Sequence, residues 1–381
     1  MIWLAALPLI VWIYFLCARG LFWLMRERDD RAVVLRSPET WPSVTAVVPA
    51  RNEADVIARV VESLLKQDYP GAFHIILVDD GSSDGTAQTA RIAALACGSS
   101  DRLEVVPGRE RLGRWTGKVW AMHQGFARAL EAGAPAYLLF TDADIAHAPD
   151  NLRRLVSLAE ERRLVLVSLM ARLHCERPAE KLLIPAFVFF FAMLFPFGWV
   201  DDRRRKTAAA AGGCMLVGRD ALLAAGGLEP IAGAIIDDCA LARLLKPHGG
   251  IWLGLSRRAV SLRPYDGLAG IAAMVARSAY SQLGYSLLLL CGTVAGMAIV
   301  YAAPPLLAIF APGPARFVGA AAWVLMALLF QPVLRFYRLS PVWGLLLPVA
   351  GLCYAAFTVQ SAVQYWRGRG GMWKGRAQAM A

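Results

Sequence analysis

Two aspartates one residue apart are the first chemical feature of the sequence. Asp142 and Asp144 follow the apolar stretch at residues 136–141, in the run Thr141-Asp-Ala-Asp. At the end of a strand, such a pair can hold a hard divalent cation, Mg²⁺ or Mn²⁺, between its carboxylate oxygens. The ion could then bridge a nucleotide diphosphate and neutralise the charge that develops on this leaving group. A solvated loop is the alternative, because the pattern alone is weak.

Two other polar segments also follow apolar runs. Pro49-Ala-Arg-Asn-Glu53 ends the β-branched run at residues 44–50, and Asp79-Asp80-Gly81 begins the loop after residues 74–78. Asp-Gly and Gly-Ser steps are ordinary in turns, and Asp84 in the second loop could simply cap the next helix. The chemistry therefore depends on a scaffold that brings these loops to the aspartate pair.

Alternating strands and helices would provide that scaffold. Apolar spacing predicts strands at residues 44–50, 74–78, 103–106 and 136–141, and helices at 54–67, after Asp84, and at 117–131. Continuous apolar strands that alternate with helices predict an α/β fold, with a mostly parallel sheet covered on both faces. In such sheets ligands bind beyond the carboxyl ends of the strands, so the polar loops are expected to meet at that edge.

The composition indicates a membrane protein. Of the 381 residues, 57% are hydrophobic and only 18% are charged, against about 25% charged in average proteins. The last acidic residue is Asp266, and the eight basic residues beyond it lie among long apolar runs. A nucleic-acid partner is therefore not expected, because it would need basic residues clustered on a polar surface. The seven cysteines and five histidines show no zinc-binding spacing.

The apolar runs predict several membrane segments. We expect an N-terminal transmembrane anchor over residues 1–25, an interfacial helix over 267–283, a C-terminal transmembrane region over 284–366, and a basic tail over 367–381. No basic residue precedes the first apolar run, which favours a retained anchor over a cleaved signal peptide. The arginines that follow the anchor (Arg19, Arg26, Arg28, Arg31 and Arg36) place the following residues in the cytoplasm. Three C-terminal spans would leave the basic tail outside, so either the tail is an exception or one run is re-entrant.

Taken in order, the polar segments resemble the family 2 glycosyltransferases, which are inverting enzymes with the nucleotide-diphospho-sugar-binding fold called GT-A. The resemblance covers residues 44–266 and implies a cytoplasmic GT-A domain over 42–266, a nucleotide-diphospho-sugar donor and a divalent cation. It implies that Asp80 binds the nucleotide base and that Asp144 contacts the metal directly, beside Asp142. Pro49, Asn52 and Glu53 would line the nucleoside pocket, and Lys118 of Thr116-Gly-Lys118 would approach the base or phosphates.

The same resemblance assigns the general base. Ile235-Ile-Asp-Asp-Cys-Ala-Leu241 resembles the family's Glu-Asp motif, whose second residue, here Asp238, accepts the proton of the attacking hydroxyl. Asp237 replaces the more usual glutamate in a supporting role. A cap for the helix through Leu245 is the alternative for this pair. An inverting enzyme of the hexosyltransferase type needs such a base opposite the leaving diphosphate.

A departure from the family pattern argues for transfer of one sugar per acceptor. Processive polysaccharide synthases of this family carry Gln-x-x-Arg-Trp on the helix after the base. Here Arg277 is present, but Met274 and Ser278 stand at the glutamine and tryptophan positions. Arg277 is expected to face the donor diphosphate, with a place at the membrane surface as its alternative.

The uncharged segment at residues 182–200 tests this architecture. If it crossed the bilayer once, Asp144 and Asp238 would lie on opposite sides of the membrane. Pro185 and Pro196 interrupt the segment, so we expect an in-plane or shallowly inserted helix, with the basic residues 203–206 against anionic headgroups. This placement would let a lipid hydroxyl reach Asp238.

Four segments indicate a particular subfamily of these enzymes. Residues 141–150, 183–191, 207–216 and 236–243 resemble the hopanoid-biosynthesis-associated glycosyltransferases. That resemblance implies a multi-pass enzyme of the bacterial inner membrane with a hopanoid or related lipid acceptor. A carotenoid, sphingolipid or polyprenyl-phosphate acceptor is the alternative. A non-catalytic nucleotide-binding membrane protein is a further one, although a transporter would be expected to carry ionisable residues within its spans.

Overall fold

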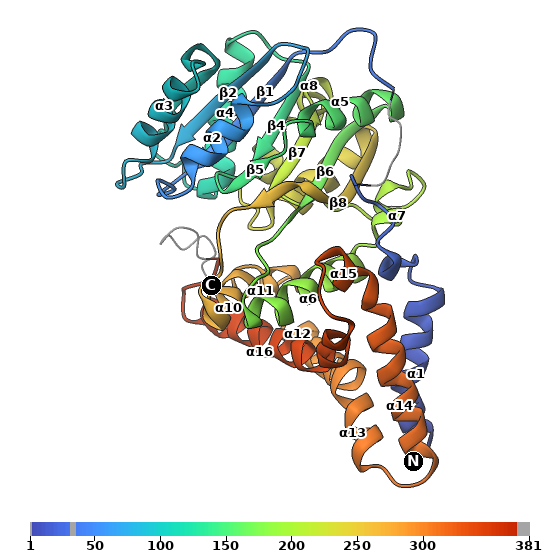
Figure 1. Cartoon of the computed structure of the whole chain (residues 1–381). Coiled ribbons are helices and arrows are strands. Elements are labelled where there is room, and N and C mark those ends of the chain that lie inside the picture. The colour runs from blue at the N-terminus through green and yellow to red at the C-terminus, as the bar shows by residue number, and fades with distance from the viewer. Residues whose placement is uncertain (1, 31–35, 372–381) are drawn as a thin grey trace. The chain divides into compact units, whose positions relative to one another are not determined.

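The computed structural model describes residues 2–30 and 36–371 and divides into two compact units. The sheet unit comprises Glu27–Leu173 and Trp199–Arg263, and the helical unit comprises Met1–Arg26, His174–Gly198 and Pro264–Ala381. Of the segments predicted above, Arg31 and the end of the basic tail, residues 372–381, lie outside the described residues. The two units are described separately (Figure 1).

The sheet unit is built on an eight-stranded sheet with the order β3-β2-β1-β4-β7-β6-β8-β5 (Figure 1). The strands are β1 (Val44–Ala50), β2 (Phe73–Asp79), β3 (Leu103–Pro107), β4 (Tyr137–Thr141), β5 (Ile145–His147), β6 (Leu164–Arg172), β7 (Cys214–Gly218) and β8 (Gly250–Ser261). Neighbours from β3 to β4 are parallel, as are β6 and β8, whereas β7 and β5 run antiparallel to their neighbours. The predicted α/β fold with a mostly parallel sheet is confirmed.

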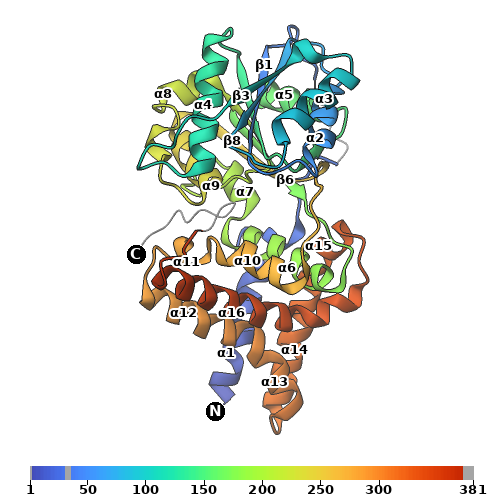
Figure 2. The ribbon, with the colours of Figure 1, turned by 90° about the vertical axis from the view of Figure 1, so that its left-hand side faces the viewer.

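Helices cover both faces of this sheet, because its central strands are apolar on both sides. All seven residues of β1 are buried. One face packs against α2 (Ile57–Leu65), α3 (Thr86–Ala96) and α5 (Asn151–Arg162) in a single apolar core. On the other face, a Cβ at Gly125 of α4 (Gly117–Glu131) would lie only 2.4 Å from Val47 Cγ1. Glycine therefore allows α4 to approach β1 closely. Figure 2 shows these helices from a second direction.

Most predicted elements are present with small shifts at their ends. The helix predicted over 54–67 begins at Ile57 and ends at Leu65, and the helix predicted over 117–131 is α4. The remaining α-helices that lie wholly within the sheet unit are short: α8 (Arg219–Ala224) and α9 (Asp237–Leu245). The short helix α7 (Phe197–Asp201) begins in the helical unit and ends in the sheet unit.

Residues 27–30 add an edge to the sheet that the sequence did not indicate. The Leu255 N–H donates to the Glu27 carbonyl at 2.9 Å, and the Asp29 N–H donates to the Leu255 carbonyl at 3.0 Å. The Asp29 carboxylate also accepts from the Arg257 N–H at 3.1 Å, and its carbonyl accepts from Arg258 Nη1 at 2.8 Å. The chain is thus fastened to β8 well before residue 42, where the sequence placed the start of the domain.

The helical unit contains three helices that are long and apolar enough to cross a membrane. They are Leu287–Phe310, which joins α12 (Leu287–Met297) to α13 (Ala303–Phe310); Pro314–Phe336, which joins α14 (Pro314–Leu329) to α15 (Gln331–Phe336); and Pro341–Trp366, which ends in α16 (Leu347–Trp366). The first has a π-helical turn at Ala298–Ala302. The N-terminal helix α1 (Ile2–Cys17) is apolar but shorter, and it packs against α14 and α13. Trp12 Nε1 donates to the Val300 carbonyl of the π-helical turn at 2.9 Å.

The segment at residues 182–200 forms most of α6 (Pro178–Leu194), which contains Pro185 and ends before Pro196. It packs against α10 (Gly267–Ala276) and α16 and is not among the helices long enough to span a membrane in the described residues. At the start of α6 the fully buried Glu180 carboxylate accepts from the N–H groups of Glu176 and Arg177, both at 2.9 Å. It also accepts from the Tyr265 N–H at 3.0 Å. Glu180 therefore ties the segment that leads into α6 to the segment that leads into α10.

We expect Glu180→Gln to destabilise the helical unit by about 2 kcal/mol, because hydrogen bonds to a buried charge are among the strong ones. Burial would raise the pKa of Glu180, but the backbone N–H donors and His174 outweigh burial and lower it to about 2. The stabilisation is thus complete above about pH 4.5 and is lost as the pH falls towards 2. Thermal unfolding in detergent should show a lower midpoint for the variant at neutral pH and a shrinking difference in acid. Glu176→Gln, whose side chain is 83% exposed, is the control.

Candidate active site

The loops predicted to meet do lie at one edge of the sheet. The parallel register places Ala50 opposite Asp79, so the loops after β1 and β2 leave the sheet side by side. They are fastened to each other: the Asn52 N–H donates to Ser82 Oγ and Asn52 Oδ1 accepts from the Ser83 N–H, both at 2.9 Å. Asn52 has a left-handed backbone with φ of 51°, a conformation that asparagine tolerates. Its side chain therefore shapes this corner of the sheet.

The residues predicted to surround the nucleoside are brought together here. Pro49 is buried in β1, and the side chain of Glu53 is only 9% exposed. The buried Asp80 lies 3.5 Å from the guanidinium of Arg51. Asp84 accepts from the N–H groups of Thr86 and Ala54 at 3.0 Å, so it holds the first residue of α3 as predicted.

Lys118 is the centre of the polar cluster. It stands on the first turn of α4, and its ammonium nitrogen lies 2.8 Å from Asp142 Oδ1 and 3.1 Å from Asp237 Oδ2. Burial alone would lower the pKa of Lys118, but the charges of Asp142, Asp237 and Asp238 outweigh it and raise the pKa above its usual value. The lysine is therefore charged, and it joins Asp142 of the predicted metal site to Asp237, the neighbour of the predicted base.

Asp238 has a different environment from its neighbour Asp237. Its Oδ2 accepts from the Gly212 N–H at 2.9 Å, and its Oδ1 accepts from the Cys239 N–H at 2.7 Å. Burial and the adjacent charge of Asp237 raise the pKa of Asp238 to about 6. Both aspartates stand in the first turn of α9, where negative charge is favourable. No side chain caps this helix, whose N-cap residue is Ile236, and the bond from Gly212 instead fixes the Asp238 carboxylate.

A buried network that the sequence did not reveal supports Asp142. The Thr141 hydroxyl donates to the Gly213 carbonyl at 2.8 Å and lies 2.8 Å from His147 Nε2. Since the hydroxyl proton is used for Gly213, Nε2 donates to Thr141, and Nδ1 accepts from Asn151 Nδ2 at 2.9 Å. Burial lowers the pKa of His147 to about 4, so the ring is neutral. Thr141 thereby links the start of the aspartate loop to the Gly212–Gly213 turn.

Asp144 faces a second cation that the sequence also did not reveal. Its Oδ2 lies 4.0 Å from Arg263 Nε and 3.5 Å from Ser261 Oγ. The Leu262 N–H donates to the Asp144 carbonyl at 2.8 Å, which fixes the chain just before Arg263. The Arg263 guanidinium also binds the Glu53 carboxylate. No sequence motif marks this arginine, because the antiparallel pairing of β5 with β8 alone brings it here.

The donor set at this edge fits a hard divalent cation. Within residues 2–30 and 36–371, no group of three or more His, Cys, Asp or Glu side chains is arranged to hold a metal ion. Mg²⁺ and similar ions, however, commonly use one or two carboxylates and complete their shell with substrate phosphates and water. Asp142 and Asp144 supply two such carboxylates. With Glu53, Asp237 and Asp238 they outnumber the cations Lys118 and Arg263, so an anionic ligand would need an added positive charge.

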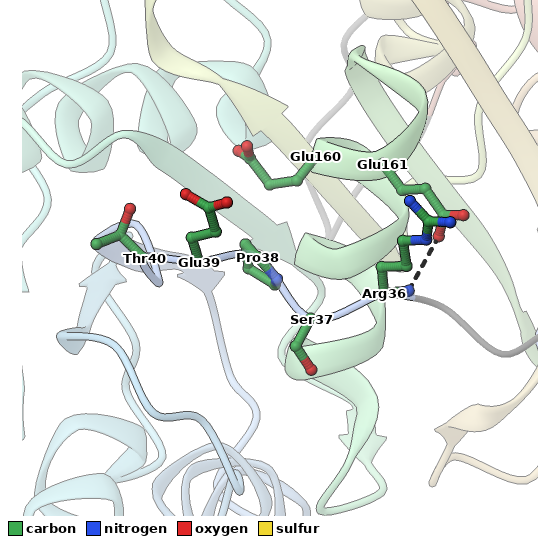
Figure 3. A pocket seen from close by; sticks show the side chains of 7 residues that line it. All are labelled: Arg36, Ser37, Pro38, Glu39, Thr40, Glu160 and Glu161. Atoms are coloured by element: carbon green, nitrogen blue, oxygen red, sulfur yellow. Dashed lines mark hydrogen bonds between the residues drawn. The ribbon is translucent and has the colours of Figure 1, made fainter.

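Two further features are Arg277 and a hollow beside α5. Arg277, predicted to face the donor, follows α10 in the helical unit, where its side chain is exposed, and its role towards the donor stays a prediction. A shallow hollow of about 440 Å³ is lined by residues 36–40 and by Glu160 and Glu161 of α5 (Figure 3). Since residues 36–40 precede β1 and Tyr137, which begins β4, donates to Glu160, the hollow is at the amino-terminal edge of the sheet. It is therefore not the candidate active site.

Comparison with known families identifies the sheet unit. Residues 45–224, from β1 through α8, match the family model described as Glycosyl transferase family 2. The chain carries a family 2 glycosyltransferase domain. The family predicted for this part of the sequence is confirmed, whereas the hopanoid-associated subfamily stays a prediction.

Individual relatives agree with this family. The chain is 32% identical over 119 residues to Glycosyltransferase AglE of Haloferax volcanii, covering 31% of this chain and 36% of that protein. It is 33% identical over 103 residues to a 4,4'-diaponeurosporenoate glycosyltransferase of Staphylococcus aureus, covering 27% of this chain and 24% of that protein. The chain thus matches well under half the length of either relative.

A solved structure shows the same fold over nearly the whole chain. The mannosyltransferase PcManGT from Pyrobaculum calidifontis, in complex with GDP-Man and Mn²⁺, superposes with a TM-score of 0.55 and 20% identity, covering 94% of both chains. The predicted GT-A fold of the glycosyltransferase domain is therefore confirmed.

Gly212 gives a direct test of the cluster. A Cβ at this position would lie 3.0 Å from Lys118 Nζ and 3.4 Å from Asp238 Oδ2, so Gly212→Ala should push the ammonium away from its carboxylates. We expect glycosyltransferase activity to fall about tenfold, equivalent to about 1.4 kcal/mol. The unfolding midpoint should change little, because the end of a lysine side chain can move.

Gly218→Ala on β7 is the matched control, since a Cβ there has no neighbour closer than 3.8 Å. Equal activity of the two glycine variants would contradict the role given to the Gly212 position.

Proposed function

We propose that the protein is a membrane-bound inverting glycosyltransferase, which moves a single sugar from a nucleotide-diphospho-sugar to a lipid hydroxyl. The observation that carries the proposal is the arrangement around Lys118. This lysine binds Asp142 and Asp237 at 2.8 and 3.1 Å, while Asp238 is oriented by backbone N–H groups. A positive charge beside the proposed donor site and a base thereby belong to one cluster.

Asp238 is the proposed general base. Two backbone N–H groups fix the orientation of its carboxylate, and its raised pKa makes it a better proton acceptor near neutral pH than an ordinary aspartate. The acceptor hydroxyl gives its proton to Asp238 as its oxygen attacks the anomeric carbon, and the bond from that carbon to the diphosphate breaks on the opposite face. Asp237 has the supporting role, because its charge is neutralised by Lys118.

The donor is proposed to bind at the carboxyl edge of the sheet. Asp80 would bind the base, and Pro49, Asn52 and Glu53 would surround the nucleoside. Asp142 and Asp144 would hold a Mg²⁺ or Mn²⁺ ion that neutralises the diphosphate as it leaves. Lys118 adds a fixed positive charge beside Asp142 and orients this carboxylate. The added divalent charge is needed because carboxylates outnumber cations in the cluster.

A lipid acceptor is supported by the helical unit. Three of its helices are long and apolar enough to cross a membrane, which fits a multi-pass enzyme of the bacterial inner membrane with a cytoplasmic catalytic domain. A hopanoid or related lipid is the acceptor that the sequence resemblance implies. A carotenoid is the second candidate, because relatives at 32–33% identity are named for 4,4'-diaponeurosporenoate.

Loss and restoration of a glycolipid would test the function. Deleting the gene in its native host should remove one glycosylated lipid, and the wild-type gene should restore it. Asp238→Asn should fail to restore it while the purified variant still binds the donor, because only the proton acceptor is lost. Mass spectrometry of the lipid fraction would identify the acceptor as a hopanoid, a carotenoid or another lipid.

A non-catalytic nucleotide-binding protein predicts the opposite result. In that case Asp238→Asn would restore the parental lipids, and no glycosylated lipid would be missing from the deletion strain. Asp220→Asn, on the exposed surface of α8, removes the same charge outside the cluster and is the control for expression.

The pH dependence of transfer would test the base separately. Since the base must be ionised and its pKa is raised to about 6, the rate at low donor concentration should fall tenfold per unit below about pH 6. An ordinary aspartate would keep its activity down to about pH 4. A profile that is flat between these values would contradict Asp238 as the base. Asp237→Asn should move the acid limb to lower pH, because it removes a neighbouring negative charge.

A further inference from the structure

The guanidinium of Arg263 lies among three carboxylates. It binds Glu53, lies 3.6 Å from Asp55 Oδ1 through Nη2, and lies 4.0 Å from Asp144 Oδ2 through Nε. Asp144 is the carboxylate proposed for direct metal contact. A cation that belongs to the chain thus stands close to the position proposed for a metal ion.

The backbone holds Arg263 at this place, and its side chain is partly exposed. Ile145 pairs with Ser261, and the Leu262 N–H donates to the Asp144 carbonyl, so the chain before Arg263 is fixed to the aspartate loop. The side chain itself is 40% exposed, whereas that of Glu53 is 9% exposed. Since the guanidinium is hydrogen-bonded to Glu53 but lies 4.0 Å from Asp144, the contact with Asp144 is the weaker of the two.

Charge determines when that movement is favourable. Glu53 and Asp144 would repel each other without a cation between them, and Arg263 supplies it. A divalent ion bound to Asp144 would in turn repel the guanidinium. Even in water, repulsion between a double and a single positive charge at such short range is expected to lower the affinity for the ion about tenfold. The arginine and the metal ion therefore compete for the same carboxylate.

We propose that Arg263 is a resident counter-cation, which neutralises Asp144 and Glu53 in the donor-free protein and opposes binding of the divalent ion by itself. The inference rests on the proposed role of Asp144 as a metal ligand. It implies that the ion binds weakly alone and becomes firmly held only when donor phosphates add their charge and oxygen ligands. Arg263 is a positioning residue in this scheme, because it acts through Asp144.

Binding of Mn²⁺ alone to the full-length protein in detergent tests the proposal, with free Mn²⁺ followed by electron paramagnetic resonance. Arg263→Gln should bind Mn²⁺ about tenfold more tightly than the wild type at low ionic strength, since it removes the repulsion estimated above. Arg263→Lys keeps the charge and should stay within about threefold of the wild type, since an ammonium exerts a similar repulsion. Arg128→Gln is the matched control, because Arg128 is 41% exposed, pairs with Glu104 and lies on α4 away from the site.

The sign of the change separates competition from a purely structural role. If Arg263 only supported the loops, Arg263→Gln would weaken Mn²⁺ binding or leave it unchanged, and either result would overturn the proposal. Asp144→Asn tests the proposed metal site independently of the role of Arg263. If it leaves Mn²⁺ binding intact, the proposed metal site is wrong. If it abolishes binding while Arg263→Gln has no effect, only the role of Arg263 is wrong.

Discussion

The bridge from Lys118 to Asp142 and Asp237 is the interaction on which the candidate site depends. These three residues come from α4, the loop after β4 and the start of α9, so one ammonium group holds three elements in place. Burial alone would lower the pKa of a lysine, but the charges of Asp142, Asp237 and Asp238 outweigh it and raise the pKa of Lys118. The charge of the lysine therefore depends on carboxylates that separate elements supply.

Two sets of contacts make up the framework that supports the carboxylates. Gly212 donates its N–H to Asp238, and the next residue, Gly213, accepts the Thr141 hydroxyl that is held by His147. The base and the aspartate loop are thus connected through one turn of backbone. On the other side of the loop, the pairing of β5 with β8 sets the position of Arg263. Asp238 and the loop that carries Asp142 are therefore held by neutral hydrogen bonds, so their positions do not depend on the charges alone.

Parts of the protein that follow a local pattern of residues could be predicted from the sequence. Apolar runs gave the strands at residues 44–50 and 136–141 and the helix at 117–131, because burial on both faces leaves an unbroken apolar signal. The family resemblance pointed to Asp142, Lys118 and Asp238, which the structure brings together. Arg263 and His147 could not be recognised in this way. Their roles arise from pairing between strands and from a buried network, and neither leaves a periodic trace in the sequence.

The predicted helix at 54–67 was too long for a related reason. Residues 54–56 form a turn that fastens the loop after β1 to Asp84, so the helix begins only at Ile57. Arg277 shows what a sequence motif alone cannot predict. It was assigned from a motif, and it lies in the helical unit, so the motif alone does not join it to the residues around Lys118.

The order of segments along the chain has a practical consequence for producing the protein. The sheet unit is interrupted by His174–Gly198, and its last residue, Arg263, is followed by the remaining helices. A truncated gene that stops after Arg263 would therefore still encode α6 but would lack α10 and α16, against which α6 packs. Its apolar side chains would face water, and the fragment would be prone to aggregate. The apolar α1 would lose α13 and α14 in the same way, so production of a soluble catalytic fragment requires that residues 1–26 be removed and residues 174–198 be replaced by a short polar linker.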